Sequence, residues 1–238
     1  ISGLPYNAFD GEFIELLLEQ TFGKKSIYTP EQMAYILDFL YPLNYTLNHH
    51  RLNGGKLTTR VPRKNLNFHS ADYRMYQEQI LQDMHPNIVI IKSRQLGLTE
   101  VAVAKTLHWI DVFASQKANA GYFFPTYKQL NAFIKTRFNT VLEDPYLKSI
   151  VDPNMNNQDV KKIRDSFIHF RTSSKPGAAE GIDLSFAAVD EYDRVGDQAI
   201  QSITNSLKGN QLQYMLRFST HSAPGIGVDR LYDTSDQW

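Results

Sequence analysis

The sequence predicts an α/β fold in which helices flank a mostly parallel β-sheet. From about residue 71 onward, short apolar runs of strand length alternate with segments of helical periodicity. Strands that are separated by helices favour parallel pairing with right-handed crossovers. Hydrophobic residues make up 42% of the 238 residues, which is enough for a packed core. The chain is therefore long enough for one large domain, or for one domain with a lid.

The first 70 residues predict a helical N-terminal lid, followed by a core over residues 71–238. Apolar residues between Phe9 and Gly23 recur close to the spacing of one helix face. Thr29 and Pro30 then supply an N-cap and a first-turn proline for a second helix. Two helices that simply pack together explain the same pattern.

The stretch between Asp38 and Asp72 contains no acidic residue, and Gly54-Gly55 predicts a turn within it. Its cations are Arg51, Lys56, Arg60, Arg63 and Lys64. A basic loop broken by glycine is suited to contact with a polyanion such as DNA. A solvated hairpin fits the same residues, so both interpretations remain open.

Strands and helices of the core follow one another in a regular order. The first strand, Asn87–Ile91, is rich in β-branched residues, and the helix Glu100–Phe113 follows it. The next strand, Ala120–Phe124, ends at Pro125 and leads into the helix Tyr127–Leu142. The remaining strands are Phe167–Arg171, Leu184–Val189 and Gln213–Ser219. Ligands of such sheets bind beyond the carboxyl ends of the strands, so we expect functional residues directly after them.

The composition narrows the classes of function. Lys and Arg number 25, as do Asp and Glu, so the net charge of zero disfavours a strongly basic nucleic-acid coat protein. The absence of cysteine excludes disulfides, thiolate zinc sites and cysteine nucleophiles. No run approaches the roughly 18 apolar residues of a membrane span, and the amino end lacks the profile of a signal peptide. We therefore expect a soluble protein of a reducing compartment with no membrane association.

The segment after the first core strand has the architecture of a phosphate-binding loop. Lys92 opens it, Arg94 lies inside it, and Gly97 and Thr99 precede the helix. Backbone N–H groups would hold phosphates there, and the Thr99 hydroxyl would bind Mg²⁺. The Walker A pattern has lysine directly before the Ser/Thr, where this sequence has Leu98. Lys92 is expected to reach the phosphates from the other side of the loop, and an ordinary strand-to-helix turn is the alternative.

An acidic pair, Asp190-Glu191, follows the apolar run Leu184–Val189. In Walker B chemistry the first carboxylate holds Mg²⁺ and the second polarises the attacking water. An apolar run that ends in two acids is common by itself. Together with the phosphate loop upstream, it predicts nucleotide hydrolysis.

Two weaker signals accompany these motifs. Ser219 and Thr220 follow the last strand, where they are suited either to bind the γ-phosphate or lytic water or to cap the strand end. Gln77 offers an amide for bidentate recognition of an adenine edge, with Tyr76 packing nearby. A solvated glutamine on an amphipathic helix is the alternative for Gln77.

These motifs together resemble the ATPase domain of the large terminase subunit of tailed bacteriophages. The resemblance covers most of the second region, from Tyr73 to about Gly227, and the segment Gly177–Asp183 is also similar. It rests on Tyr76-Gln77, Ser93–Thr99, Val189–Glu191 and Ser219-Thr220, in that order. Leu98 departs from the commoner loop of the family, but some members are similar in carrying the lysine where Lys92 stands.

The resemblance implies a P-loop ATPase of the ASCE type that hydrolyses ATP with Mg²⁺ and translocates double-stranded DNA into a procapsid. The residues implied in nucleotide binding are Gln77, Lys92, Ser93, Arg94, Gln95, Leu96, Gly97, Leu98 and Thr99. Glu191 would be the catalytic base, Arg94 would stabilise phosphate charge, and Arg137 would serve as an arginine finger donated to a neighbouring subunit. Thr99 and Asp190 would bind Mg²⁺. Ser219 and Thr220 would couple hydrolysis to movement.

The resemblance also implies partners and a location. Family members form homo-oligomeric rings, here expected to be a pentamer, which work with a portal protein and a small terminase subunit. They act in the host cell cytoplasm while docked transiently on the viral procapsid. The nuclease domain of the family is expected to be absent from this chain, because the sequence ends at Trp238, so DNA cleavage is not predicted.

Two other functions fit parts of the sequence. A nucleotide-binding scaffold that has lost hydrolysis is favoured by Leu98 and opposed by the Asp190-Glu191 pair. A helicase-like DNA-dependent ATPase would need a second domain with helicase motifs.

Overall fold

The structure is a computed structural model that describes residues 18–19, 22–25, 27–52, 54–57, 59–61 and 72–235. The predicted helix Phe9–Gly23 lies outside these residues except near its end. Arg63 and Lys64 also lie outside them. The predicted division at residue 70 falls in the same undescribed stretch, so it stays a prediction.

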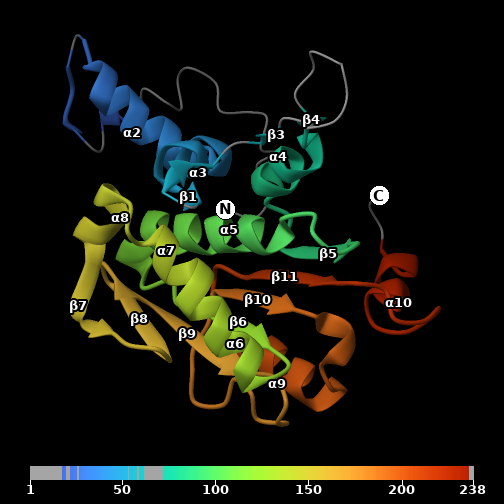
Figure 1. Ribbon diagram of the computed structural model, residues 1–238. Coiled ribbons are helices and arrows are strands. Elements are labelled where there is room, and N and C mark those ends of the chain that lie inside the picture. Colours follow the sequence, from blue (N-terminus) through green and yellow to red (C-terminus); the bar gives the residue numbers. More distant parts are fainter. Residues whose placement is uncertain are drawn as a thin grey trace.

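A seven-stranded sheet with the order β5-β11-β10-β6-β9-β8-β7 forms the centre of the molecule (Figure 1). Its parallel strands are β5 (Asn87–Ile91), β11 (Tyr214–Ser219), β10 (Phe186–Asp190), β6 (Ala120–Phe124) and β9 (Ser166–Thr172). At one edge, β8 (Val160–Ile163) and β7 (Val151–Asn156) continue the sheet in antiparallel pairing. The mostly parallel sheet is confirmed, and each predicted strand lies within two residues of its predicted bounds.

Helices cover both faces of this sheet. On one face lie α5 (Leu98–Val112) and a continuous helical run that comprises α6 (Tyr127–Phe133), a π-helical turn (Ile134–Phe138) and α7 (Asn139–Val141). On the other face lie α9 (Asp197–Leu207) and α10 (Val228–Asp233), and α10 packs against β5 and β11. No helix in the described part of the chain is long and apolar enough to cross a membrane.

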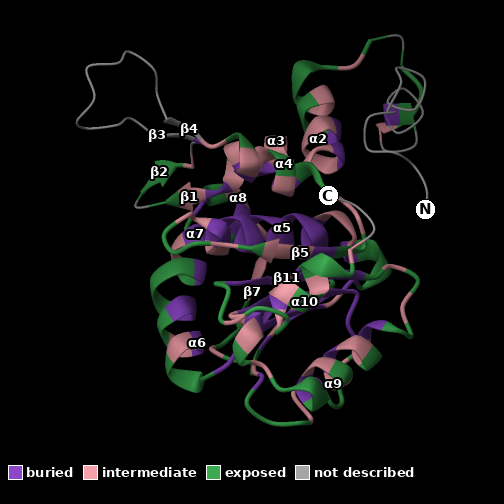
Figure 2. Cartoon of the chain, turned by 90° about the vertical axis from the view of Figure 1, so that its right-hand side faces the viewer, coloured by how far each residue is buried: buried purple, intermediate pink, exposed green. Residues whose placement is uncertain are grey.

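A third layer of helices covers the outer side of α5. It contains α2 (Pro30–Leu40), α3 (Pro42–His49) and α4 (Met75–Gln82), of which α3 and α4 pack directly on α5. As a result, nearly every residue of α5 is buried (Figure 2). The predicted cap of α2 is confirmed, because Thr29 and Gln32 form a reciprocal capping box.

Two short pairs of antiparallel strands lie between α3 and α4 in the chain. β1 (Arg51–Leu52) pairs with β2 (Gly55–Lys56), and β3 (Arg60–Val61) pairs with β4 (Asp72–Tyr73). Gly54 has a φ of +80°, which suits the turn between β1 and β2. Residues 51–56 thus form the hairpin that was one of the two interpretations of the basic stretch, and DNA contact there remains a prediction.

The sequence did not reveal β7, β8 and the helix α8 (Pro145–Ile150) that precedes them. The strand β7 reads Val-Asp-Pro-Asn-Met-Asn, and most of it is exposed at the edge of the sheet. Edge strands with proline and polar residues lack the apolar alternation that identifies a strand. This explains why the pattern could not identify β7.

A buried lysine joins α5 to α4. Lys105 Nζ donates hydrogen bonds to the carbonyl oxygens of Ile80, Leu81 and Asp83, at 2.8, 2.9 and 2.5 Å. These carbonyls lie at the C-terminal end of α4, where helices leave acceptors without intrahelical donors. Burial lowers the pKa of Lys105 to about 7.

This pKa predicts a pH dependence of stability. Between pH 7 and 10.5 the unfolded chain binds a proton at Lys105 that the folded chain does not, so the free energy of unfolding should rise with pH by up to about 1.4 kcal/mol per unit. Chemical denaturation of the wild type and of Lys105→Met at pH 6.5 and 9 measures this contribution. We expect the stability of the wild type relative to the variant to increase with pH, and an unchanged difference would contradict the neutral lysine.

Candidate nucleotide-binding site

The predicted motifs meet at the carboxyl ends of three adjacent strands. The phosphate loop follows β5, the acidic pair ends β10, and Ser219 ends β11, which lies between them. The register pairs Ser219 with Ile91 and Asp190 with Phe218. Motifs that lie up to 127 positions apart in the sequence are therefore neighbours at one edge of the sheet.

Left-handed backbone shapes the phosphate loop. Gln95 and Gly97 have φ angles of +64° and +73°, and Gly97 is the N-cap of α5. A Cβ atom at Gly97 would lie 2.7 Å from Nε2 of Gln77, so a larger residue would displace the Gln77 side chain as well as strain the backbone. The loop therefore turns sharply before the first N–H groups of α5.

Three side chains converge beneath this loop. Lys92 Nζ donates a hydrogen bond to Asp190 Oδ1 at 3.2 Å, and the Thr99 hydroxyl donates one to Asp190 Oδ2 at 3.3 Å. Asp190 is only 3% exposed, and burial raises its pKa, which the Lys92 ammonium lowers only in part. The lysine at the start of the loop and the first carboxylate of the predicted Walker B pair thus form one cluster with the Thr99 hydroxyl in the first turn of α5.

Leu98 occupies the position of the Walker A lysine but does not face the loop. Its side chain is buried in the main hydrophobic core. In contrast, Ser93, Arg94 and Gln95 are exposed on the loop, and Arg94 makes no hydrogen bond or ion pair with any described residue. The guanidinium of Arg94 thus has no partner in the described part of the chain, and its binding of a phosphate remains a prediction.

Glu191 follows Asp190 with a left-handed backbone, at a φ of +53°. Non-glycine residues in this region store strain, which is common at functional sites. Its carboxylate oxygen Oε2 accepts hydrogen bonds from Gln129 Nε2 at 2.9 Å and from Arg194 at 3.0 Å. Neither of these two partners of the predicted catalytic base was predicted from the sequence.

A local signal in the sequence points to Gln129. Thr126 is the N-cap of α6, and Gln129 stands three residues later, which is the spacing of a capping box. Here the Thr126 hydroxyl donates to Gln129 Oε1 at 2.7 Å, and this bond turns the amide nitrogen of Gln129 toward Glu191. The motif predicts the start of the helix. The contact of Gln129 with Glu191 arises because β6, which precedes α6, lies next to β10, which precedes Glu191.

The predicted adenine-reading residues contact the phosphate loop itself. Tyr76 Oη and Gln77 Nε2 each donate a hydrogen bond to the carbonyl oxygen of Leu96, both at 2.8 Å. Gln77 is 6% exposed. In this arrangement α4 holds the loop from behind, and recognition of adenine by Gln77 remains a prediction.

Arg137 lies on the π-helical turn and contacts α5 of its own chain. Its guanidinium donates to Glu100 Oε1 at 2.6 Å, while Oε2 of the same carboxylate lies 3.1 Å from Nε2 of the buried His50. Burial alone would raise the pKa of Glu100, but the bonds to His50 and Arg137 outweigh it and lower the pKa. Arg137 is about half exposed, at 49%, so its role as a finger for a neighbouring subunit remains a prediction.

Ser219 connects the phosphate loop to the acidic segment. Its carbonyl accepts from the backbone N–H of Lys92 at 2.9 Å, and its hydroxyl accepts from the backbone N–H of Asp193 at 3.3 Å. Thr220 follows at an exposed position. Ser219, the first of the two predicted coupling residues, therefore lies between the phosphate loop and the acidic segment.

The oxygen atoms of this cluster suit a magnesium ion. Mg²⁺ prefers oxygen ligands and is usually held by one or two protein groups together with phosphates and water. Asp190 and Thr99 offer a carboxylate and a hydroxyl within hydrogen-bonding distance of each other. Among the described residues there is no group of three or more His, Asp or Glu side chains that would bind a metal ion by itself.

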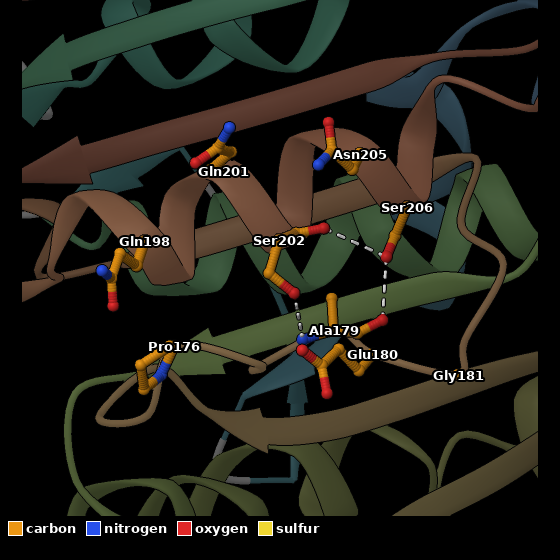
Figure 3. Close-up of a pocket in the computed structure, with 9 residues that line it drawn as sticks. All are labelled: Pro176, Ala179, Glu180, Gly181, Gln198, Gln201, Ser202, Asn205 and Ser206. Carbon is orange, nitrogen blue, oxygen red and sulfur yellow. Dashed lines mark hydrogen bonds between the residues drawn. The ribbon is translucent and has the colours of Figure 1, made fainter.

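A separate cavity of about 430 Å³ lies between α9 and the turn 176–181 (Figure 3). Ser202 Oγ accepts from the backbone N–H of Ala179, and Ser206 Oγ donates to the carbonyl of Ala179. These bonds fasten the turn to α9. None of the residues predicted to bind nucleotide lines this cavity.

Comparison with known proteins identifies the family. The sequence model of the family described as "Phage terminase large subunit gpA, ATPase domain" matches residues 74–212, more than half of the chain. The chain belongs to this family. The matched part of the terminase domain contains the phosphate loop, the acidic pair and α4, and no curated protein sequence matches the chain significantly.

Solved terminase structures share the fold of this terminase domain. The HK97 bacteriophage large terminase is 12% identical, with a TM-score of 0.64 over 82% of this chain and 40% of that one. The large terminase ATPase domain of Thermus phage P74-26 is 16% identical, with a TM-score of 0.51 over 62% of this chain and 64% of that one. At these identities the likeness concerns the fold. The terminase domain spans less than two thirds of either chain.

Proposed function

We propose that this terminase domain hydrolyses ATP with Mg²⁺ and drives double-stranded DNA into a viral procapsid. The observation that carries the proposal is the convergence of Lys92 and Thr99 on Asp190 at the ends of adjacent parallel strands. Family membership supports the same reaction.

Each residue of the site has a role in this proposal. Lys92 and Arg94 neutralise phosphate charge, and Glu191 orients and deprotonates the attacking water. Thr99 and Asp190 would hold Mg²⁺, which supplies charge stabilisation to the transferred phosphoryl group when bound. Catalysis of this kind depends mainly on the positions of charges, so the bonds that fix Glu191 and Asp190 matter as much as the groups themselves.

The motor role extends the proposal beyond the site. The domain would work as a homo-oligomeric ring, a pentamer, together with a portal protein and a small terminase subunit. Its place would be the host cytoplasm, with transient docking on the procapsid. Ser219 and Thr220 are proposed to couple hydrolysis to DNA movement, and the hydrogen bonds of Ser219 to both Lys92 and Asp193 support this role.

The test is phosphate release from ATP with and without Mg²⁺, over a range of protein concentrations. We expect activity that requires Mg²⁺ and rises faster than linearly with protein concentration, because neighbouring subunits complete the site. Nucleotide binding without turnover would favour the scaffold that has lost hydrolysis. Failure to bind nucleotide would overturn the proposal.

Arg137 is proposed to act in a neighbouring subunit, and mixing experiments test this role. An arginine finger contributes about 10³–10⁵ to the rate, so a ring of Arg137→Ala subunits should be nearly inactive. In mixtures with wild type, we expect activity to fall more steeply than the fraction of variant subunits. Lys135→Ala, an exposed cation on the same turn, is the matched control. A loss strictly proportional to the variant fraction would instead favour a role within one chain, through Glu100.

A further inference from the structure

The carboxylate of Asp193 is surrounded by donors from a distant segment of the chain. Asp193 lies two residues after Glu191, in the 3-10 turn η3 (Tyr192–Arg194). Its Oδ2 accepts from the backbone N–H and the hydroxyl of Ser222, at 3.0 and 2.6 Å, and its Oδ1 accepts from the backbone N–H of Val228 at 2.9 Å. One side chain therefore fastens both ends of segment 222–228.

The backbone of Asp193 extends this connection to the phosphate loop. Its N–H donates to Ser219 Oγ at 3.3 Å, and the carbonyl of Ser219 accepts from the N–H of Lys92 at 2.9 Å. A continuous path of hydrogen bonds thus runs from the first residue of the phosphate loop, through the end of β11, to segment 222–228.

The backbone conformation of Gly227 allows the contact between Val228 and Asp193. Its φ is +59°, a conformation that side-chain-bearing residues rarely adopt, and a Cβ atom there would overlap Oδ1 of Asp193. Glycine at this position allows the N–H of Val228 to reach the carboxylate. The backbone conformation of Gly227 and the carboxylate of Asp193 therefore fit together at this contact.

A second acidic residue, Asp229, lies directly after segment 222–228 and binds the loop that contains it. Asp229 Oδ2 accepts from the N–H of Gly225 at 2.5 Å, and Oδ1 lies 3.3 Å from Nε2 of His221. Both partners belong to the same loop, and Ile226 in that loop is 54% exposed. The carboxylate of Asp193 connects the segment to the turn that follows Glu191, whereas the carboxylate of Asp229 makes bonds only within its own loop.

We propose that Asp193 is a positioning residue that holds the turn after Glu191 against segment 222–228 and transmits changes at the nucleotide site to that segment. The inference rests on the proposed ATPase function. The carboxylate of Asp193 binds Ser222 and Val228 and none of the residues predicted to bind nucleotide or Mg²⁺, so its removal should affect the rate of the chemical step and the movement of the segment rather than affinity.

The first test separates kcat from nucleotide affinity. In Asp193→Ala we expect the Kd for ATP to stay within about 3-fold of wild type while kcat falls at least about 10-fold. Asp229→Ala should keep kcat within about 3-fold, because its bonds stay inside the loop. Asp193→Asn keeps the shape of the side chain but cannot accept hydrogen bonds from both Ser222 and Val228. Its kcat should lie between those of Asp193→Ala and Asp229→Ala. It replaces Asp193→Ala if that variant does not fold.

The second test uses Gly227→Ala in a double-mutant cycle. The added methyl group displaces the Asp193 carboxylate, so this single change should lower kcat as well. In Asp193→Ala/Gly227→Ala the overlap with the carboxylate is gone and only the backbone strain at residue 227 remains, so the loss should be smaller than the product of the two single effects. Fully multiplicative effects would show that the two residues act independently and would overturn the inference.

A measurement on the wild type keeps the inference testable even without turnover. Hydrogen exchange at the amides of Ser222 and Val228 should change when Mg²⁺ and a nonhydrolysable ATP analogue are added to the wild type, and should not change in Asp193→Ala. An equal response in both proteins, or a wild-type kcat in Asp193→Ala, would overturn the role of Asp193. Absence of nucleotide binding by the wild type would instead overturn the proposed function, on which the inference rests.

Discussion

Glu191→Gln is expected to abolish ATP turnover and to leave nucleotide binding intact. The amide cannot accept a proton from the attacking water, so the rate should fall by about 10²–10⁴. Gln has the same shape as Glu, and its side-chain oxygen can still accept from Gln129 and Arg194, which hold Glu191 in place. The Kd for ATP should therefore change by less than about 3-fold.

Steady-state phosphate release and titration with a fluorescent ATP analogue measure the two quantities separately. Glu143→Gln is the matched control, because Glu143 is an exposed carboxylate that pairs with Lys148 far from the site. It should hydrolyse ATP like the wild type. Wild-type turnover by Glu191→Gln would remove Glu191 from the role of the base.

Lys92→Ala is expected to weaken both nucleotide binding and turnover, each by about 10². Lys92 is the cation nearest the Walker B carboxylate, 3.2 Å from Asp190, and its ammonium also lies 4.8 Å from the centre of the Phe218 ring. Its removal leaves the buried Asp190 without its charged partner, which raises the pKa of Asp190 further and weakens it as a ligand.

Binding titrations of Lys92→Ala and Arg94→Ala rank the two cations. Lys208→Ala, which removes an exposed lysine at the end of α9, is the control for a general effect of charge. We expect the loss in Lys92→Ala to exceed that in Arg94→Ala, because Lys92 is already fixed beside Asp190. The reverse order would make Arg94 the main phosphate cation.

Moving the lysine to the standard Walker A position should not rescue the site. Leu98 is 4% exposed and packs in the core, so a lysine there would bury an ammonium group or force its side chain out of α5. Lys92→Ala/Leu98→Lys is therefore expected to stay inactive and to melt at a lower temperature than Lys92→Ala. Recovery of activity would mean that the loop can adopt the common arrangement.

The sequence was sufficient to predict the five parallel strands and the edge of the sheet at which the predicted motifs meet. The parallel strands are short, apolar and rich in β-branched or aromatic residues, which is a strong local signal, and β5 and β10 are clear cases. The convergence of Lys92, Thr99 and Asp190 follows from parallel strands that end at one edge. The order of motifs and strands along the sequence was informative because it shows which residues directly follow each strand.

The remaining contacts depend on side chains that meet across elements. Gln77 reaching Leu96, Arg137 reaching Glu100 and Asp193 reaching Ser222 leave no periodicity in the sequence, since each pair lies 19 or more positions apart. Polar residues with distant partners look the same as solvated ones. Their partners become apparent only when the strand order and the helix layers are known.

The insertion of β11 between β5 and β10 has a consequence for synthesis of the protein. A ribosome makes β5 long before residues 214–219, yet in the finished sheet β5 pairs with β11, which also pairs with β10 on its other side. Until β11 emerges, the strand that carries the phosphate loop has no partner in the sheet, and the two halves of the site cannot be fixed at their final spacing. Such distant pairing is slow to form, so the nascent chain should stay inactive until its last strand is in place.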